Sequence, residues 1–291
     1  KIMVSTQQEM DEQYAHPIYT SALEQLDKNK FEIIPPGVNE NIFSQTAAPT
    51  DRTLKQKLDA INGINRKPVI LVSSRLDEKK NIMGVVKAYL ENNELITRAN
   101  LVLCFRGIND PAADILKISK EEQIVLRKIL KIIELGHIQE YVHFLNIGSQ
   151  LELAATYRYF AQRGSVFALT SLYEPFGLAP LEAAATGLVP VVTKNGGPSE
   201  IFSDGSGVLV DPTSSKNISK GLIDGLNRYS EISKNAMQLV KEKYTWRQTA
   251  NRYLHSINDV INSKQKIGGV EQIKLNDTEL IYDYLKSIAD R

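Results

Sequence analysis

The chain has 291 residues, of which 42% are hydrophobic and 24% charged, a balance typical of a globular protein with one large or two ordinary domains. Because 35 Lys and Arg residues oppose 34 Asp and Glu residues, the net charge of +1 gives no basis for binding nucleic acid or an anionic membrane surface. No apolar stretch approaches the ~20 residues that span a bilayer. The single cysteine, Cys104, cannot form an internal disulfide, so we predict a core residue in a reducing, cytoplasmic compartment.

Short β-branched runs alternate with helical patterns along most of the chain. Strands that are apolar on both faces and separated by helices indicate a parallel sheet covered on both sides. We therefore predict a doubly wound, Rossmann-like α/β fold, in which ligands bind at the carboxyl ends of the strands. In chain order, strands are expected at 1–5, 31–35, 68–74, 100–107, 141–146, 165–170, 188–193 and 207–211, and helices at 81–95, 118–135, 150–162, 178–186, 215–228 and 230–263.

Residues 36–50, rich in Pro, Asn and Thr, interrupt this alternation and are predicted to be a linker. We expect 51–262 to be the α/β domain and 263–291 a tail with an amphipathic helix at 278–290. Since 1–35 has no sheet of its own and the chain begins without methionine, we expect it to be the end of a preceding, mostly absent domain. The alternative is that 1–35 adds an edge strand to the same sheet.

The stretch "YEPFGLAPLEAAATGLVP" (173–190) follows a predicted strand and opens a predicted helix. Pro180 is tolerated in a first helical turn but not deep in a helix, so the helix is expected to begin near Gly177. The N–H groups of Gly177, Leu178 and Ala179 then lack partners and face the crevice with the positive end of the helix dipole. This arrangement predicts an anion site suited to a phosphate.

Glu174 lies just ahead of this helix and Glu182 one turn inside it, so both can border the same pocket. Carboxylates accept hydrogen bonds from vicinal hydroxyls, which sugars and riboses offer. A phosphate flanked by sugars on both sides describes a nucleotide sugar. The alternative is that both glutamates are solvated residues that help to cap a helix.

Two further loops follow predicted strands. "SRLDEKKN" carries Arg75 and Lys80, two cations that could neutralise a diphosphate, although such a sequence can also be a solvated turn. "NGGPSEIF" carries Gly196 and Gly197, which allow close backbone approach, although a capped glycine turn is the simpler reading.

In combination, "SRLxxKK", "EPFGLxPLE" and "NGGPxEI" resemble the nucleotide-binding half of the retaining GT-B glycosyltransferases of family 4, with the E-x7-E spacing of Glu174 and Glu182. The resemblance covers residues 1–262 and is strongest to the sucrose-phosphate synthases; sucrose synthase and mannosylfructose-phosphate synthase are near relatives. It implies the C-terminal domain of a GT-B enzyme whose N-terminal domain is mostly missing. The motifs closest to the sucrose-phosphate synthases are "VSTQQE", "IPPGVN", "SSRLDEKKN", "RGINDP", "GSVFALTSLYEPFGLAPLEA" and "YTW".

The resemblance also implies roles for individual residues. Arg75 and Lys80 would bind the diphosphate and stabilise the leaving nucleotide, and Glu174 would hold hydroxyls of the donor glucose. Glu182 would take the ribose hydroxyls. Gly148 stands where the relatives usually carry Asn, which leaves the base, uracil or adenine, open. The remaining implied donor-site residues are Gly107 in the phosphate region, Ile147 and Gln150 around the base, and Phe176, Gly177, Leu178 and Ala179 around the sugar and phosphates.

The implied reaction is transfer of glucose from UDP-glucose to fructose 6-phosphate with retention, with no metal or other cofactor required. The acceptor would be bound mostly by the missing N-terminal domain, onto which the helix at 278–290 could dock. The other possibilities are a sucrose synthase, a GDP-mannose-using relative, or a nucleotide-sugar-binding module that is inactive on its own.

Overall fold

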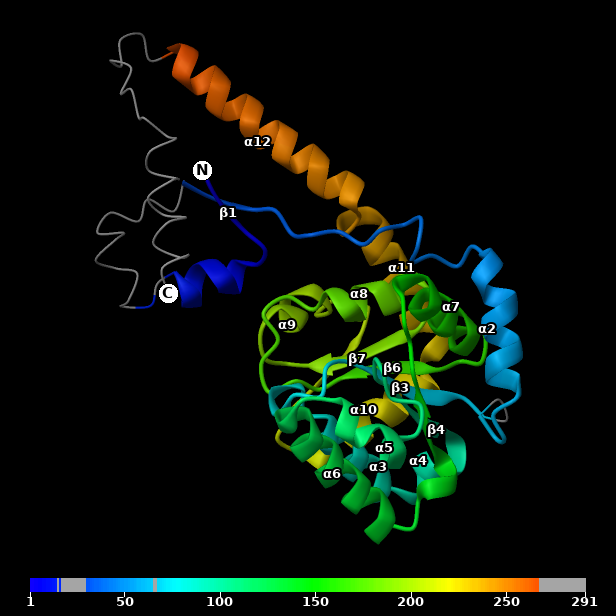
Figure 1. Ribbon diagram of the computed structural model, residues 1–291. Coiled ribbons are helices and arrows are strands. Elements are labelled where there is room, and N and C mark those ends of the chain that lie inside the picture. Colours follow the sequence, from blue (N-terminus) through cyan, green and yellow to red (C-terminus); the bar gives the residue numbers. More distant parts are fainter. Residues whose placement is uncertain (15, 17–29, 65–66, 267–291) are drawn as a thin grey trace. The chain divides into compact units, whose positions relative to one another are not determined.

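The computed structural model describes residues 1–14, 16, 30–64 and 67–266 (Figure 1). The described residues up to Tyr253 form one compact unit, and those from Leu254 onward belong to a second. The helix predicted at 278–290 lies outside the described residues. Among the helices in the described ranges, none is both long and apolar enough to cross a membrane.

Six parallel strands form the main sheet, in the order β5-β4-β3-β6-β7-β8. Each strand falls within a range predicted from its apolar run, and the doubly wound fold is confirmed. The strand bounds are β3 Val69–Ser73, β4 Asn100–Cys104, β5 Val142–Leu145, β6 Val166–Leu169, β7 Val189–Thr193 and β8 Val208–Val210.

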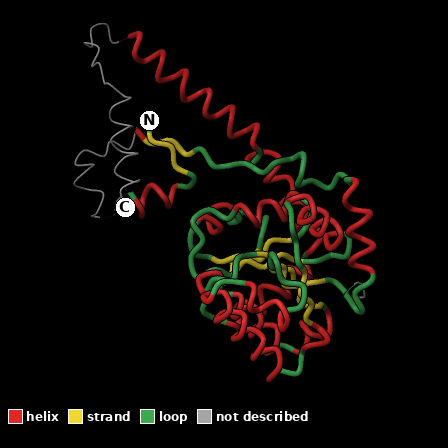
Figure 2. The backbone as a smooth tube through the Cα atoms, in the orientation of Figure 1, coloured by secondary structure: helices red, strands yellow, loops and turns green. Residues whose placement is uncertain are grey.

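Successive residues of the central strand contribute to opposite faces of the sheet. Ile70 and Val72 pack in one core cluster with α3, α4, α6 and α10, whereas Val69 and Leu71 pack in the other with α2, α7, α8 and most of α11. Figure 2 shows the strands lying between these helical layers. The helix bounds are α2 Pro49–Asp59, α3 Ile82–Leu90, α4 Asn93–Arg98, α5 Pro111–Asp114, α6 Lys120–Leu135, α7 Gln150–Ala161, α8 Leu178–Ala185, α9 Gly197–Ile201, α10 Ser215–Asn227, α11 Tyr229–Lys243 and α12 Trp246–Lys266.

The first two strands are separate from this sheet. β1 (Ile2–Val4) and β2 (Phe31–Ile33) lie parallel and form a two-stranded sheet with each other. Within the described residues, the alternative in which 1–35 supplies an edge strand to the main sheet is therefore wrong, and so is the premise that 1–35 has no sheet of its own. The domain boundaries drawn from the sequence stay predictions, and within the predicted linker helix α2 already begins at Pro49.

Two predicted helices are each divided in the structure. The range 230–263 breaks into α11 and α12 at Tyr244–Thr245, because Val38 bridges this point: its N–H donates to the Tyr244 carbonyl (2.8 Å) and its carbonyl accepts from Trp246 (3.2 Å). The range 81–95 breaks into α3 and α4 because the Asn92 side chain accepts hydrogen bonds from the amides of Glu94 and Leu95 and starts a new helix.

The strand order reverses direction between β3 and β6, which are neighbours in the sheet but far apart in the chain. In doubly wound folds a crevice opens at such a switch point, at the carboxyl ends of the strands. The loops that leave β3 and β6 carry the "SRLDEKKN" and "SLYEPFG" motifs. The fold therefore brings the two main candidate motifs to one edge of the sheet.

Candidate functional site

The loops after β3 and β6 are tied together by hydrogen bonds. The Leu172 amide donates to the Lys79 carbonyl (2.8 Å). The Asn81 side-chain amide donates to the carbonyls of Thr170 (3.0 Å) and of Pro212, in the loop after β8 (2.8 Å). Asn81 itself has a positive φ of 53°, at the end of the short 3₁₀ helix Glu78–Lys80. Three loops at the carboxyl edge of the sheet are thus joined through one side chain.

The "NGG" turn fixes the backbone of Glu174. The Glu174 amide donates to the Asn195 carbonyl (3.2 Å), and the Glu174 carbonyl accepts from the Gly197 amide (2.9 Å). Gly196 has a φ of +92°, and a Cβ there would lie 2.1 Å from the Glu174 carbonyl oxygen. Only glycine permits this approach. The predicted glycine turn is therefore a support for the loop that carries Glu174.

Helix α8 begins where the sequence predicts. Gly177 has a φ of +99°, a left-handed conformation suited to glycine, and helix α8 runs from Leu178 with Pro180 in its first turn. No side chain caps this end. The first amides of an α-helix lack intrahelical partners, so this terminus offers donors and positive potential to a ligand.

The two predicted cations differ in their surroundings. The Arg75 guanidinium is exposed and has no ionic or hydrogen-bonding partner within the described residues. Lys80 Nζ lies 2.7 Å from Glu174 Oε2, and the side chains of this pair are only 22% and 13% exposed. Within the described residues, one cation is therefore unpaired and the other is neutralised by a carboxylate predicted to bind the sugar.

Glu182 lies in the second turn of α8, half-buried, with no ionic or hydrogen-bonding partner in the described part of the chain. Burial raises the pKa of its carboxyl group to about 7. A surface carboxylate that only caps a helix would remain solvated and acidic. Glu182 instead has a partly desolvated carboxyl group whose hydrogen-bonding capacity is open to a ligand.

A cavity of about 330 Å³ lies beside Arg75 at the carboxyl ends of β3, β4 and β5. It is lined by Ile147 and Gln150, which the resemblance places around the base, and by five polar residues that were not singled out from the sequence: Ser73, Ser74, Arg106, Glu122 and Ser149. Ser73 and Arg106 could have been found, because they stand at or just after the ends of the same strands. Glu122 comes from α6 and carries no such signal.

Gly107 does not line this cavity. Its φ is +82°, and its amide donates to the Asn146 side-chain oxygen (2.8 Å), so this N–H is engaged by the protein. Gly148 does line the cavity, and its amide donates to Glu152 Oε2 (2.7 Å). Glu200, in the "NGG" motif, accepts hydrogen bonds from the amides of Gln7 and Gln8.

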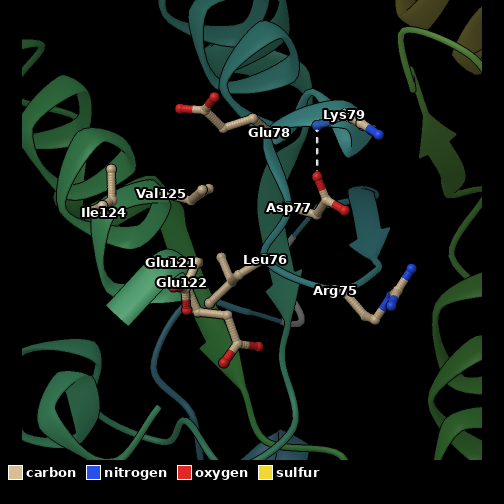
Figure 3. A pocket seen from close by; sticks show the side chains of 9 residues that line it. All are labelled: Arg75, Leu76, Asp77, Glu78, Lys79, Glu121, Glu122, Ile124 and Val125. Carbon is tan, nitrogen blue, oxygen red and sulfur yellow. Dashed lines mark hydrogen bonds between the residues drawn. The ribbon is translucent and has the colours of Figure 1, made fainter. Parts of the chain in front are cut away.

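A second cavity, of about 650 Å³, shares Arg75, Leu76 and Glu122 with the first and extends along α6 (Figure 3). In Figure 3 the Arg75 side chain points away from the carboxylates of Glu121 and Glu122. The Arg75 guanidinium therefore forms no ion pair with Glu121 or Glu122, and it can meet a ligand at the carboxyl ends of the strands (Figure 3).

Cys104 is buried in the core, as predicted. Among the described residues no three or more His, Cys, Asp or Glu side chains are grouped so as to hold a metal ion.

The comparisons with known proteins bear on the family and the fold of the chain. The family described as "Glycosyl transferases group 1" matches residues 55–246. A probable sucrose-phosphate synthase of Thermosipho melanesiensis is 37% identical over 88% of this chain, which spans 53% of that protein. The resemblance to the sucrose-phosphate synthases is thereby confirmed, and the chain spans about half the length of this relative.

Solved structures show the same fold. Sucrose-phosphate synthase from Thermosynechococcus elongatus superimposes with a TM-score of 0.67 at 20% identity, covering 90% of this chain and 58% of that one. HepE of Anabaena, in complex with UDP-glucose, gives a TM-score of 0.65 at 18% identity, covering 88% of this chain and 63% of that one.

Proposed function

The chain belongs to the group 1 glycosyl transferases, and we propose that it supplies the donor site of a sucrose-phosphate synthase-like enzyme that transfers glucose from UDP-glucose to fructose 6-phosphate with retention. The observation that carries this proposal is the meeting of the β3 and β6 loops at one edge of the sheet, which brings Arg75 to the same edge as the α8 terminus, with Glu182 in the second turn of α8. Within the described residues neither the Arg75 guanidinium nor the Glu182 carboxyl group has an ionic or hydrogen-bonding partner. A cation and free amide donors suit a diphosphate, and a carboxylate suits the hydroxyls of the ribose and the sugar on either side of it.

In this proposal each part of the donor meets a specific group. Arg75, Lys80 and the α8 terminus hold the diphosphate, and Glu182 accepts the two ribose hydroxyls. Glu174 accepts hydroxyls of the glucose. The remaining contacts are Ile147 and Gln150 with the base, and Phe176, Gly177, Leu178 and Ala179 with the sugar and phosphates. Gly107 makes no direct contact in this proposal, because its amide donates to Asn146.

The proposed chemistry is same-face attack on the anomeric carbon. The bond from this carbon to the leaving phosphate oxygen breaks, and a bond to the acceptor hydroxyl oxygen forms on the same face. The acceptor proton passes to the leaving diphosphate. Arg75 and Lys80 stabilise the negative charge that develops on that group, the step in which fixed cations lower a barrier most. The positive charge in this scheme comes from the protein, so no metal is invoked.

The acceptor half of the enzyme is also part of the proposal. In this proposal a second Rossmann-like domain binds fructose 6-phosphate and closes over the donor. The described residues do not contain that domain. Holding the acceptor against the anomeric carbon can be worth ~7–11 kcal/mol of barrier. We therefore expect this chain alone to bind the donor without forming sucrose 6-phosphate. Ordinary turnover, measured as UDP release with UDP-glucose and fructose 6-phosphate, would contradict this division.

Calorimetric titration with UDP, ADP and GDP and with their glucose and mannose derivatives tests the donor assignment. UDP and UDP-glucose are expected to bind best. A clear preference for GDP and GDP-mannose would move the chain to the mannosylfructose-phosphate synthases, and no nucleotide binding at all would contradict the proposed function. A sucrose synthase would instead be indicated if the complete enzyme accepted free fructose in place of its 6-phosphate.

Replacing Arg75 with alanine is expected to weaken UDP binding by about 1.5–3 kcal/mol, the scale of a charge-assisted hydrogen bond. Because the Arg75 guanidinium has no ionic or hydrogen-bonding partner among the described residues, this loss reports the ligand contact and not a disrupted fold. Uridine, which lacks the diphosphate, is expected to bind the variant as it binds the wild type. Arg98→Ala, which removes an exposed cation from a helical ion pair with Glu94, serves as the control for net charge. Equal losses for uridine and UDP would contradict a phosphate contact.

The affinity for UDP-glucose is expected to fall as the pH is lowered from 8 to 6. The pKa of Glu182 is raised to about 7 by burial, so its ionised, hydroxyl-accepting form falls from about nine tenths to about one tenth over this range. UDP-glucose is the suitable probe because its diphosphate is esterified at both ends, whereas a terminal phosphate titrates near pH 6. The Glu182→Gln variant is expected to bind more weakly with a flatter pH profile; an unchanged profile would contradict the role of Glu182.

A further inference from the structure

The ion pair between Lys80 and Glu174 joins two groups to which the proposed function gives different ligand partners. Lys80 Nζ and Glu174 Oε2 lie 2.7 Å apart in a largely buried setting, and the Ser171 hydroxyl donates to the same carboxylate oxygen (3.3 Å). A phosphate needs the cation, and sugar hydroxyls need the carboxylate. While Lys80 and Glu174 are paired, Lys80 cannot bind a phosphate fully and Glu174 cannot accept hydrogen bonds from a sugar at the same oxygen.

The backbones that carry these side chains are fixed. Lys80 precedes Asn81, whose side chain is anchored to two neighbouring loops, and Asp77 caps the same 3₁₀ helix through the Lys79 amide (2.8 Å). Glu174 is held through both its amide and its carbonyl by Asn195 and Gly197. A change of partner therefore needs only side-chain rotation, with both loops remaining in place.

The charges favour such an exchange when a diphosphate enters. Arg75 and the α8 terminus can attract the anion without losing a partner among the described residues. Once it is bound, Lys80 faces a group of higher negative charge than one carboxylate, and like charges repel Glu174 from the same position. Glu174 keeps its Ser171 hydrogen bond and gains free acceptor capacity for hydroxyls.

We infer that a bound nucleotide diphosphate takes Lys80 from Glu174 and so releases the Glu174 carboxylate to accept hydrogen bonds from the donor sugar, an inference that rests on the proposed function. The diphosphate thus switches on the sugar subsite. The coupling is reciprocal. The factor by which a bound diphosphate weakens the Lys80–Glu174 pair equals the factor by which that pair weakens diphosphate binding.

The test is UDP titration of four proteins: the wild type, Glu174→Gln, Lys80→Met and the double variant. In Glu174→Gln, Lys80 no longer has to leave an anionic partner, so UDP is expected to bind about five- to thirtyfold more tightly than to the wild type. UDP-glucose is expected to gain less, because the amide is a poorer acceptor for the sugar. The ratio of the two affinities therefore shifts toward UDP.

The Lys80→Met variants distinguish two explanations for a gain in UDP affinity: the exchange of Lys80 from Glu174 to the diphosphate, and the mere loss of repulsion between Glu174 and the phosphates. If Glu174 only repelled the phosphates, its neutralisation would tighten UDP binding equally with and without Lys80. Exchange predicts that the gain nearly disappears in the double variant. Thermal unfolding shows whether each protein is folded, and Lys80→Gln replaces Lys80→Met if the latter is not.

The outcomes distinguish the two proposals. UDP binding to the wild type with no gain in Glu174→Gln, or with the same gain in both backgrounds, would overturn this inference and leave the proposed function standing. No UDP binding to the wild type would overturn both.

Discussion

Replacing Arg158 with methionine is expected to lower the free energy of unfolding by about 3 kcal/mol, the lower end of the cost of breaking a buried ion pair. The Arg158 side chain is only 5% exposed. Its Nε and Nη2 donate to the two carboxylate oxygens of Asp51 (2.9 and 2.6 Å), and Nη1 donates to the carbonyls of Ile42 and Ser44. Methionine fills a similar volume but leaves these acceptors without donors. Urea unfolding followed by circular dichroism measures the loss.

The Asp51 carboxyl group makes this pair informative. Burial alone would raise its pKa, but the hydrogen bond from Arg158 and the Ala48 amide lower it overall. Without Arg158, the Asp51 carboxylate loses the main interaction that offsets the cost of its burial. Arg98→Met is the matched control, because the Arg98–Glu94 pair is an exposed i,i+4 pair, whose loss is expected to cost under about 0.5 kcal/mol. Similar losses in both variants would show that Arg158 does not hold the segment around Ile42 to the domain.

Replacing Gly196 with alanine is expected to cost about 3 kcal/mol of stability and to lower the affinity for UDP-glucose at least tenfold. The added Cβ would stand 2.1 Å from the Glu174 carbonyl oxygen, at a φ of +92° that other residues rarely adopt. The turn must move away, the hydrogen bond from Gly197 to Glu174 is lost, and the Glu174 carboxylate, which is proposed to bind the sugar, shifts. UDP, which makes no contact with Glu174 in the proposed donor site, is expected to lose less affinity. Urea unfolding and calorimetry give the two values.

Gly205→Ala is the control for backbone conformation alone. Gly205 has a φ of +84°, yet a Cβ there meets no atom within 4 Å. Its replacement is expected to cost about 1 kcal/mol without changing UDP-glucose binding. If Gly196→Ala behaved the same way, the contact with Glu174 would have no functional role.

The main sheet could be predicted because its strands are apolar on both faces. "PVILVSS" and "SVFALT" have no polar face, so each must be covered on both sides, and the helical patterns between them supply the layers. The partner of residues 1–5 could not be read in this way. Three-residue strands such as Ile2–Val4 carry too little pattern to choose between neighbours, and only the fold shows that Phe31–Ile33 pairs with them.

Helix ends escaped prediction where a distant segment determines them. The break at Tyr244–Thr245 depends on Val38, more than 200 positions earlier in the chain, and leaves no local signal beyond "YTW". The start of α8 was predicted closely because glycine and proline act locally: Gly177 adopts the left-handed conformation and Pro180 suits a first turn.

For the candidate site too, local signals could be read from the sequence, whereas contacts between distant residues could not. Residue types and spacing singled out Arg75 and Glu182, and both are without protein partners in the described structure. The pairing of Lys80 with Glu174 joins residues 94 positions apart and could not be seen in either motif. Nor could the sequence show that the Gly107 amide is already bound to Asn146.

The side-chain amide of Asn81 has a consequence for any attempt to redesign the proposed donor site. Because it holds the carbonyls of Thr170 and Pro212 at once, and its side chain lies where a Cβ on Gly84 would stand, the three loops and the start of α3 behave as one part. Grafting a single loop from a relative would leave this junction mismatched. A successful exchange would move residues 74–84, 170–177 and 211–214 together, as one cassette that keeps its own asparagine.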